Sequence, residues 1–342
     1  MKAPSITVAI PTYNRLDLLK KTIHSVFAQE APPDEILVVD DASTEREVWE
    51  YLKGLERIRL IRNKKNLGSF ENINKCIRLA KSDYVIVVQS DDLIMPGCVK
   101  SYKDIMEKYG KKPAVYFSGG YNIDEYDKVK GRVRPLKGNQ LLEPPASIRT
   151  LWDNHWFHIL IGGWSAFRRD IFKKVGYFTR NYGRVGEIEM TLKIVPKFPL
   201  FYIDRALFAF RIHSLQGLEG QAKKAGIERG IDEAKDASRA LHDYEYEAEI
   251  NKSFTSRERK ERIFVRKPIV FLLVISVYYF LTGDSQKAKK YFAIFRKAYP
   301  KPIYSPLTAE LALRWLTKLI PEHISNALLR FKLRGKKVQE IT

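Results

Sequence analysis

Two adjacent acids, Asp91 and Asp92, follow an apolar run at residues 84–88, with Gln89 and Ser90 in between. Such a run is typical of a buried strand. Neighbouring carboxylates repel each other, so a folded chain keeps them together only where something offsets their charge. A divalent cation can do this, because Mg²⁺ and Mn²⁺ prefer carboxylate oxygens as ligands. A metal site at the end of a strand is one explanation of the pair. The other is that the two acids only cap the turn at Pro96, and the pair taken alone favours this second explanation.

Polar residues also follow two earlier predicted strands. Pro11, Thr12 and Tyr13 come after residues 6–10, and Asp40 comes after residues 35–39. Ligands of parallel α/β sheets bind outside the carboxyl ends of the strands. We therefore expect these residues and the acid pair to share one crevice.

The alternation of strand-like and helix-like segments predicts an α/β fold with a mostly parallel sheet and right-handed crossovers. Residues 122–145 are polar and rich in charges, and we predict a long loop there. From residue 214 the pattern is helical, so we predict two domains, 1–215 and 216–342. The remaining expected strands are 58–61, 114–117, 201–204 and 207–210, and the expected helices are 16–29, 45–55, 69–80 and 147–161.

The formal net charge is +20. Residues 251–342 hold 20 Lys and Arg against 6 Asp and Glu, a net of +14. A basic region of this kind attracts an anionic membrane surface, nucleic acid or a phosphorylated substrate, or simply aids solubility. The sequence shows no helix-turn-helix, zinc finger or RNA-binding sheet motif, so we do not expect nucleic acid as a partner.

Several features bear on localisation. The first apolar run is too short for a signal peptide, and the uncharged run at residues 268–283 is too short for a confident membrane-spanning helix. The two cysteines, Cys76 and Cys98, suggest neither a zinc site nor a disulfide framework, and they fit a reducing compartment. We predict a cytoplasmic protein that can lie peripherally on the cytoplasmic face of the cell membrane.

Six segments between residues 5 and 213 occur in an order that resembles the family 2 glycosyltransferases. They are VAIPTYNR, EILVVDDAST, NLGSFENINKCIRLAKSDYVIVVQSDD, GGWSAFRRDIFKKVGYF, GEIEMTLKI and RALFAFRIH. The resemblance implies a GT-A fold, a Rossmann-like, mostly parallel mixed sheet flanked by helices, followed here by a C-terminal helical region. It also implies an inverting transfer of a sugar from a nucleoside-diphosphate sugar, with UDP favoured, to a hydroxyl of a glycan or a lipid-linked acceptor in cell-surface polysaccharide synthesis.

The resemblance implies a divalent metal, Mn or Mg, held by Asp91, Asp92 and His213. The family pattern here is usually Asp-x-Asp-Asp, whereas this chain has Gln89-Ser90-Asp91-Asp92. The missing first acid leaves metal binding dependent on Asp91, with Asp92 as a helper or a structural partner. The residues implied in donor binding are Pro11, Thr12, Tyr13, Arg15, Asp40, Asn66, Gly68, Gln89, Ser90 and Asp91.

The resemblance places the catalytic base at Glu187, with Glu189 as the runner-up. Trp164 and Glu189 would line the acceptor side. A carboxylate can take the proton of the attacking hydroxyl when its surroundings tune its pKa. The alternative for these two acids is stabilisation of a helix N-terminus by the helix dipole.

Two other function classes stay open, and the sequence argues against a third. The missing first acid makes a nucleotide-sugar-binding protein without catalysis conceivable. The basic C-terminal region leaves a nucleic-acid-binding protein as an alternative. A nucleotidyltransferase would need a glycine-rich, basic phosphate loop after the first strand, and PTYNR is not one.

Overall fold

The computed structural model describes residues 4–153, 165–182 and 186–212, and scattered positions between 236 and 293. The chain divides into two compact units, Met1–Gly217 with Glu247–Ser253, and Leu218–Tyr246 with Phe254–Thr342. The elements discussed below belong to the first unit. No helix among the described residues is long and apolar enough to cross a membrane.

Within the described residues, ten strands form one sheet, with β3-β2-β1-β4-β9-β6-β10-β5 as its main path. The pairs of β1 with β2 and β4, of β2 with β3, and of β6 with β10 are parallel, whereas β9, β5, β7 and β8 pair antiparallel. The strands are β1 (Ile6–Thr12), β2 (Glu35–Asp40), β3 (Arg59–Arg62), β4 (Tyr84–Val87), β5 (Leu93–Ile94), β6 (Val115–Ile123), β7 (Val129–Val133), β8 (Gln140–Leu142), β9 (Ser165–Arg168) and β10 (Leu200–Arg211).

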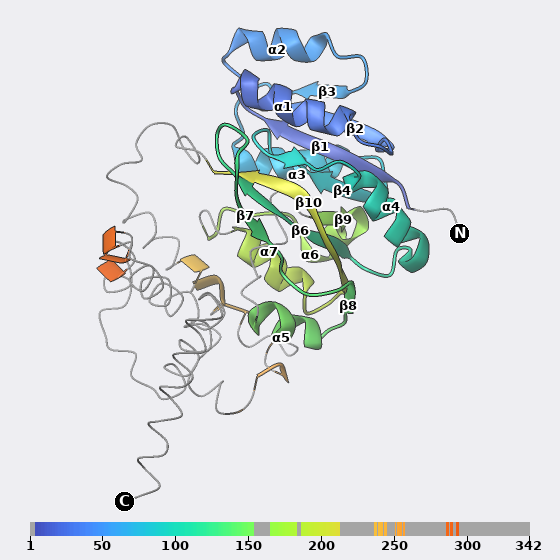
Figure 1. The fold of residues 1–342 in the computed structure, drawn as a ribbon, viewed down its shortest axis with the longest axis vertical. Helices are drawn as coiled ribbons and strands as arrows, with labels where there is room; N and C mark the ends of the chain where they lie inside the picture. The colour runs from blue at the N-terminus through green and yellow to red at the C-terminus, as the bar shows by residue number, and fades with distance from the viewer. Residues whose placement is uncertain are drawn as a thin grey trace, which may run out of the picture. The chain divides into compact units, whose positions relative to one another are not determined.

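Helices connect these strands (Figure 1). They are α1 (Leu16–Phe27), α2 (Arg46–Lys53), α3 (Ser69–Leu79), α4 (Cys98–Tyr109), α5 (Ala146–Asp153), α6 (Phe172–Val175) and α7 (Gly186–Ile194), with a short 3₁₀ turn at Arg169–Ile171. Because the chain moves outward from β1 to β3 and then returns to β4, right-handed crossovers place α3 on the face opposite α1 and α2.

The N-terminal half folds as its apolar pattern predicts. All seven residues of β1 are buried, as a central strand covered on both faces requires. Helix α1 buries Leu19, Ile23 and Val26 along one stripe. These packed elements fix the carboxyl ends of β1, β2 and β4 at one edge of the sheet. The α/β, mostly parallel fold predicted from the sequence is confirmed.

Two details of the sequence prediction are wrong. The predicted loop at 122–145 contains β7 and β8, and β6 extends to Ile123. The two strands predicted at 201–204 and 207–210 are one strand, β10, with irregular register between Ile203 and Phe208. The pair Gly119-Gly120 lies within β6, where the absence of side chains lets neighbouring strands approach closely. A Cβ on Gly120 would lie 2.4 Å from the Phe208 carbonyl oxygen.

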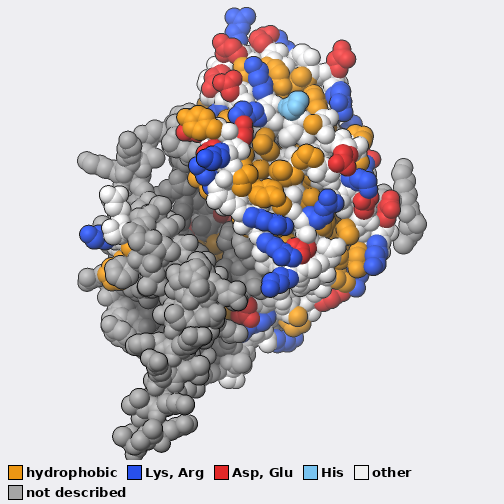
Figure 2. Space-filling view, in the orientation of Figure 1, with side chains coloured by type: hydrophobic (Ala, Val, Ile, Leu, Met, Phe, Trp, Pro, Cys, Tyr) orange, Lys and Arg blue, Asp and Glu red, His pale blue; other side chains and the backbone are white. Residues whose placement is uncertain are grey.

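Charges of both signs are interspersed on the face of the first unit shown in Figure 2. One ion pair in this unit anchors the irregular part of β10. Arg134 contacts both carboxylate oxygens of Asp204, and the Gly138 amide donates to Asp204 Oδ2 at 2.7 Å. The hydrogen bonds from Arg134 are the main influence that lowers the pKa of Asp204 to about 2.

This shift predicts a pH-dependent contribution to stability. The folded-state pKa lies below the ordinary value of about 3.9, so the stabilisation is present above about pH 4 and is lost as the pH falls to about 2. We expect Asp204→Asn to lower the free energy of unfolding at pH 7, and the difference from the wild type to shrink over that interval. Urea unfolding at a series of pH values measures this.

Asp170→Asn is the matched control, because Asp170 is exposed and pairs with a single arginine, Arg168. Its difference from the wild type should be small throughout. A gap between Asp204→Asn and the wild type that does not change between pH 4 and pH 2 would contradict the assignment.

Candidate active site

The ends of β1 and β2 lie side by side. Thr12 pairs with Asp40 in the parallel register, and the Asp41 amide donates to the Thr12 carbonyl at 2.8 Å. Asp40 is fully buried. Its Oδ1 accepts from the amide and hydroxyl of Ser43, and Arg62 Nε lies 3.2 Å from its Oδ2. The Asp40 carboxylate therefore supports the turn after β2 as well as lying at the predicted donor edge.

Asp41 organises the loop before α3. Its carboxylate accepts hydrogen bonds from the Asn63 side chain at 2.6 Å and from the amides of Leu67 and Gly68, each at 2.8 Å. Gly68 has φ 83, in the left-handed region that favours glycine. These contacts attach the loop and the N-terminus of α3 to the end of β2.

The loop after β1 has an unusual backbone. Asn14 and Arg15 both have positive φ, 56° and 62°, which is uncommon for residues other than glycine. Asn14 Oδ1 accepts from the amides of Thr44 at 2.8 Å and Glu45 at 3.1 Å, so this loop is joined to the loop after β2. The arrangement directs Arg15 toward β4, where its Nη1 lies 3.1 Å from Asp91 Oδ2.

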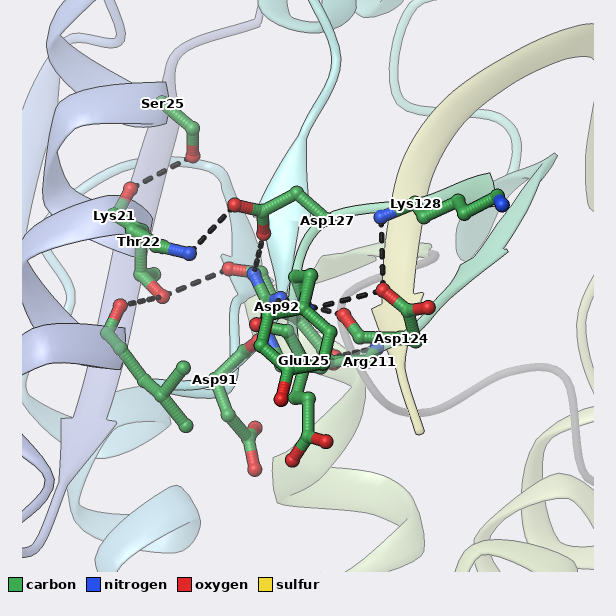
Figure 3. A network of polar contacts seen from close by, with 12 residues as sticks. Lys21, Thr22, Ser25, Asp91, Asp92, Asp124, Glu125, Asp127, Lys128 and Arg211 are labelled. Atoms are coloured by element: carbon green, nitrogen blue, oxygen red, sulfur yellow. Dashed lines mark hydrogen bonds and ion pairs between the residues drawn. The ribbon is translucent and has the colours of Figure 1, made fainter. Parts of the chain in front are cut away.

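The two adjacent acids occupy different environments. The Asp91 side chain is 16% exposed and pairs with Arg15. Asp92 is buried, and its Oδ1 accepts from the Arg211 amide at 2.9 Å. Burial, and then the charge of Asp91, raise the pKa of Asp92 well above its ordinary value. Figure 3 shows the Asp91 carboxylate pointing away from the cluster that surrounds Asp92. Their repulsion is therefore relieved by an arginine for one acid and by a raised pKa for the other.

This geometry bears on the predicted metal. Among the described residues, no three Asp, Glu, His or Cys side chains form a group that could hold an ion. Asp91 is partly exposed at the strand edge, whereas Asp92 is committed to the main chain of Arg211. Such a donor set fits a cation that takes one protein carboxylate and completes its shell with phosphate oxygens and water, which is the usual behaviour of Mg²⁺. Of the two roles left open for Asp92, the contacts favour the structural one.

The N-terminus of α7 lies against the N-terminus of α3. A Cβ on Gly186 would lie 2.8 Å from Phe70 Cζ, and Phe70 is the second residue of α3. Glu187 follows Gly186 and is half-buried. Since the loop before α3 is tied to the end of β2, this contact brings Glu187 to the same edge of the sheet as Asp40.

Glu189 has a different environment from Glu187. It is buried, its Oε2 accepts from Thr179 Oγ1 at 2.6 Å, and its Oε1 pairs with Lys193 Nζ at 2.7 Å. These contacts give Glu189 a structural role within α7. They favour Glu187 over Glu189 as the candidate base.

The structure thus brings most of the predicted donor residues to one edge. Trp164 and His213 lie outside the described residues, and Asn66 is exposed. Thr12 is buried, and within the described chain its hydroxyl has no hydrogen-bond partner. Sequence reasoning assigned no role to four further residues that shape this edge, although three of them lie within the quoted segments and the fourth follows the expected strand 58–61. They are Asn14, Ser43, Arg62 and Arg211.

Comparison with known proteins decides the family. The sequence model described as "Glycosyl transferase family 2" matches residues 7–176. This chain belongs to glycosyltransferase family 2. The matched residues run from β1 through β9 to the end of α6, and they include Asp40, Asp91 and Asp92.

Curated relatives agree with this family. An uncharacterised glycosyltransferase of Rickettsia typhi (strain ATCC VR-144 / Wilmington) is 25% identical over 215 residues, which is 63% of this chain and 66% of the relative. TuaG of Bacillus subtilis (strain 168), named for glycosyl transfer in teichuronic acid biosynthesis, is 36% identical over 108 residues, or 31% of this chain and 40% of TuaG. The first relatives are thus matched over about a third to two thirds of their length.

The fold also matches a solved structure. Residues 1–349 of S. aureus TarS, crystallised in complex with UDP-GlcNAc, give a TM-score of 0.53 at 15% identity, covering 86% of this chain and 92% of the TarS chain. At this identity the likeness concerns the fold. The family 2 chain therefore has the GT-A fold that its sequence segments implied.

The contact between α7 and α3 generates a prediction. We expect Gly186→Ala to destabilise the protein by about 1–3 kcal/mol, because the added methyl overpacks against Phe70. The double variant Gly186→Ala with Phe70→Leu should lose less than the two single losses together, since the smaller side chain relieves the overlap. Urea unfolding of the four proteins measures this coupling.

Gly131→Ala is the control, because an added Cβ at Gly131 meets no atom within 4 Å. Additive losses in the double variant would show that α7 does not lie against Phe70.

Proposed function

We propose that this protein transfers a sugar from a nucleoside-diphosphate sugar to a hydroxyl of a glycan or lipid-linked acceptor. The observation that carries the proposal is the ion pair of Arg15 with Asp91, which joins the loop after β1 to the acids after β4. Asp40 lies beside Thr12 at the same edge. In a parallel sheet, this is where a nucleotide binds.

Arg15 and Asp91 have complementary tasks in this proposal. Asp91 would hold Mn²⁺ or Mg²⁺, with diphosphate oxygens and water as the other ligands. The cation would act as a Lewis acid that offsets the charge of the leaving diphosphate. Arg15 pairs with Asp91 in the structure, and its guanidinium would also lie within reach of a diphosphate bound beside Asp91.

Glu187 is the proposed base. The acceptor oxygen attacks the anomeric carbon and forms the new glycosidic bond, while the bond from that carbon to the diphosphate breaks. The hydroxyl proton passes to the Glu187 carboxylate. This displacement inverts the anomeric centre and needs no covalent enzyme intermediate.

The finer assignments rest on the family and on composition. UDP is the favoured donor nucleotide, and the structural relative TarS was crystallised with UDP-GlcNAc. Cell-surface polysaccharide synthesis is the proposed setting, in line with the printed name of TuaG. Residues 1–215 would form the transferase domain. Residues 216–342 would form a helical C-terminal region, and its basic residues 251–342 would lie on an anionic membrane surface at the cytoplasmic face.

A nucleotide and metal screen tests the donor site. We expect UDP with Mn²⁺ to raise the Tm of the wild type, because a ligand at a hundred times its Kd stabilises the folded state by about 2.7 kcal/mol. Asp91→Asn should abolish the part of the shift that needs Mn²⁺. Thermal unfolding with UDP, GDP or dTDP, each with Mn²⁺ or EDTA, measures both effects.

Asp104→Asn is the control, because Asp104 forms an exposed pair with Lys100 on α4. It should keep the full shift. A wild type that no nucleotide stabilises would count against a donor site at this edge.

Substitution of Glu187 tests the chemistry. We expect Glu187→Gln to lower kcat by about 100- to 10,000-fold, the usual contribution of a general base, and to keep the nucleotide-induced shift in Tm. Glu189→Gln should instead lower the free energy of unfolding, because it disrupts the buried contacts with Thr179 and Lys193. Transfer assays with a panel of nucleotide sugars, together with urea unfolding, separate these effects. Full activity in Glu187→Gln would reject the base assignment.

A further inference from the structure

The Arg211 side chain is fully buried at the end of β10. Isolated buried charges are costly, so arginines in protein interiors are paired and hydrogen-bonded. This one makes an unusual set of contacts with the main chain. Its Nε donates to the Asp91 carbonyl at 2.8 Å, and its Nη1 donates to the carbonyl of Asp124 at 2.8 Å, with the Glu125 carbonyl at 3.4 Å.

An acid completes the surroundings of this guanidinium. Asp127 Oδ1 lies 2.5 Å from Arg211 Nη2, and Asp127 Oδ2 lies 2.6 Å from Lys21 Nζ on α1. Asp127, in the turn between β6 and β7, has φ 67. Residues 88–95, which carry Asp91 and Asp92, are called the acid loop below. Figure 3 shows that the network links this loop with α1, the turn between β6 and β7, and the end of β10.

The backbone of Arg211 is also fixed from the acid loop. Its amide donates to Asp92 Oδ1 at 2.9 Å. Arg211 and the two acids are therefore joined by reciprocal hydrogen bonds. The guanidinium donates to the Asp91 carbonyl, and the Asp92 carboxylate accepts from the Arg211 amide. Thr22 Oγ1 adds a bond to the Asp92 carbonyl at 2.8 Å.

We propose that Arg211 is a positioning residue for the donor site, and that it acts by fixing the main chain of Asp91. The inference rests on the proposed function, since it assigns the cation to Asp91. Arg211 binds the carbonyl of Asp91 and leaves its carboxylate directed away from the network, where it pairs with Arg15. Asp127 acts indirectly, because its carboxylate holds the Arg211 guanidinium in place.

Both ends of the acid loop contact ordered structure. The Val88 amide donates to the Ala9 carbonyl at 2.9 Å, and the Met95 amide donates to the Leu207 carbonyl at 2.8 Å. Between Val88 and Met95, the Asp91 carbonyl accepts a hydrogen bond from Arg211. Asp91 itself lies outside β4 and β5, so strand pairing does not hold it. Loss of the guanidinium would therefore loosen the loop at the residue that carries the metal-binding carboxylate.

Arg211→Lys is the sharpest variant. It keeps the positive charge but replaces a planar fork of donors by a single ammonium, which cannot reach the carbonyls of two separate segments in the same geometry. Asp127→Asn is the second variant. We expect this variant to fold, because the Asp127 side chain is 40% exposed. Arg134→Gln is the control, because it removes an arginine–aspartate pair elsewhere on the sheet.

Hydrogen exchange measured by mass spectrometry tests the positioning directly. In Arg211→Lys we expect amides of residues 88–95 and 124–128 to exchange about tenfold faster than in the wild type, a difference of 1.4 kcal/mol in local opening. Asp127→Asn should show a smaller increase over the same residues. Arg134→Gln should leave them unchanged. If Arg211→Lys does not fold, Asp127→Asn carries the same test.

Metal dependence gives the functional readout. With the nucleoside diphosphate that stabilises the wild type, we expect Arg211→Lys to raise about tenfold the Mn²⁺ concentration needed for half of the metal-dependent Tm shift. The shift produced by the nucleotide in EDTA should not change. A general structural defect would reduce both shifts together.

The outcomes separate the two proposals. If no nucleotide stabilises the wild type, the proposed donor site fails, while the exchange rates still show whether Arg211 fixes the acid loop. If nucleotide and Mn²⁺ stabilise the wild type but the folded variants show unchanged exchange and unchanged Mn²⁺ dependence, the positioning role is overturned.

Discussion

The separation of two adjacent carboxylates is the constraint on which this site depends. Asp91 and Asp92 are joined by a peptide bond, so the fold cannot move them apart and must give them different surroundings. Arg15 meets the charge of Asp91, and burial raises the pKa of Asp92. Burial and the charge of Asp91 disfavour the ionised form of Asp92, so Asp92 serves as a structural hydrogen-bond acceptor, whereas the Asp91 carboxylate faces Arg15.

This separation imposes conditions on the neighbouring loops. Arg15 reaches Asp91 from a left-handed backbone conformation, which a residue other than glycine adopts only where its surroundings enforce it. Asn14 supplies that enforcement through its bonds to the loop after β2. This edge of the sheet is therefore one connected unit, in which Asp40 and Asp91 are linked through the turns that follow β1 and β2.

Sequence patterns were sufficient for the elements governed by local periodicity and for the residues that end parallel strands. Thr12 and Asp40 follow buried apolar runs, and their adjacency is a consequence of parallel pairing. The sequence did not reveal β7, the continuity of β10, or the role of Arg211, because each depends on contacts between distant segments. Gly120 shows the reason: its missing side chain matters only once Phe208 lies beside it.

The same long-range contacts explain how a chain without the first acid of the family pattern can still present a defined carboxylate. A loop that ends a strand is free to move unless its carbonyls are bonded, and the carbonyl of Asp91 is bonded by a buried guanidinium. That guanidinium is held in turn by Asp127, which Lys21 also contacts. Helix α1, the turn between β6 and β7, and β10 all contribute to this network. The main chain of Asp91 is therefore held by contacts from three separate elements of the fold.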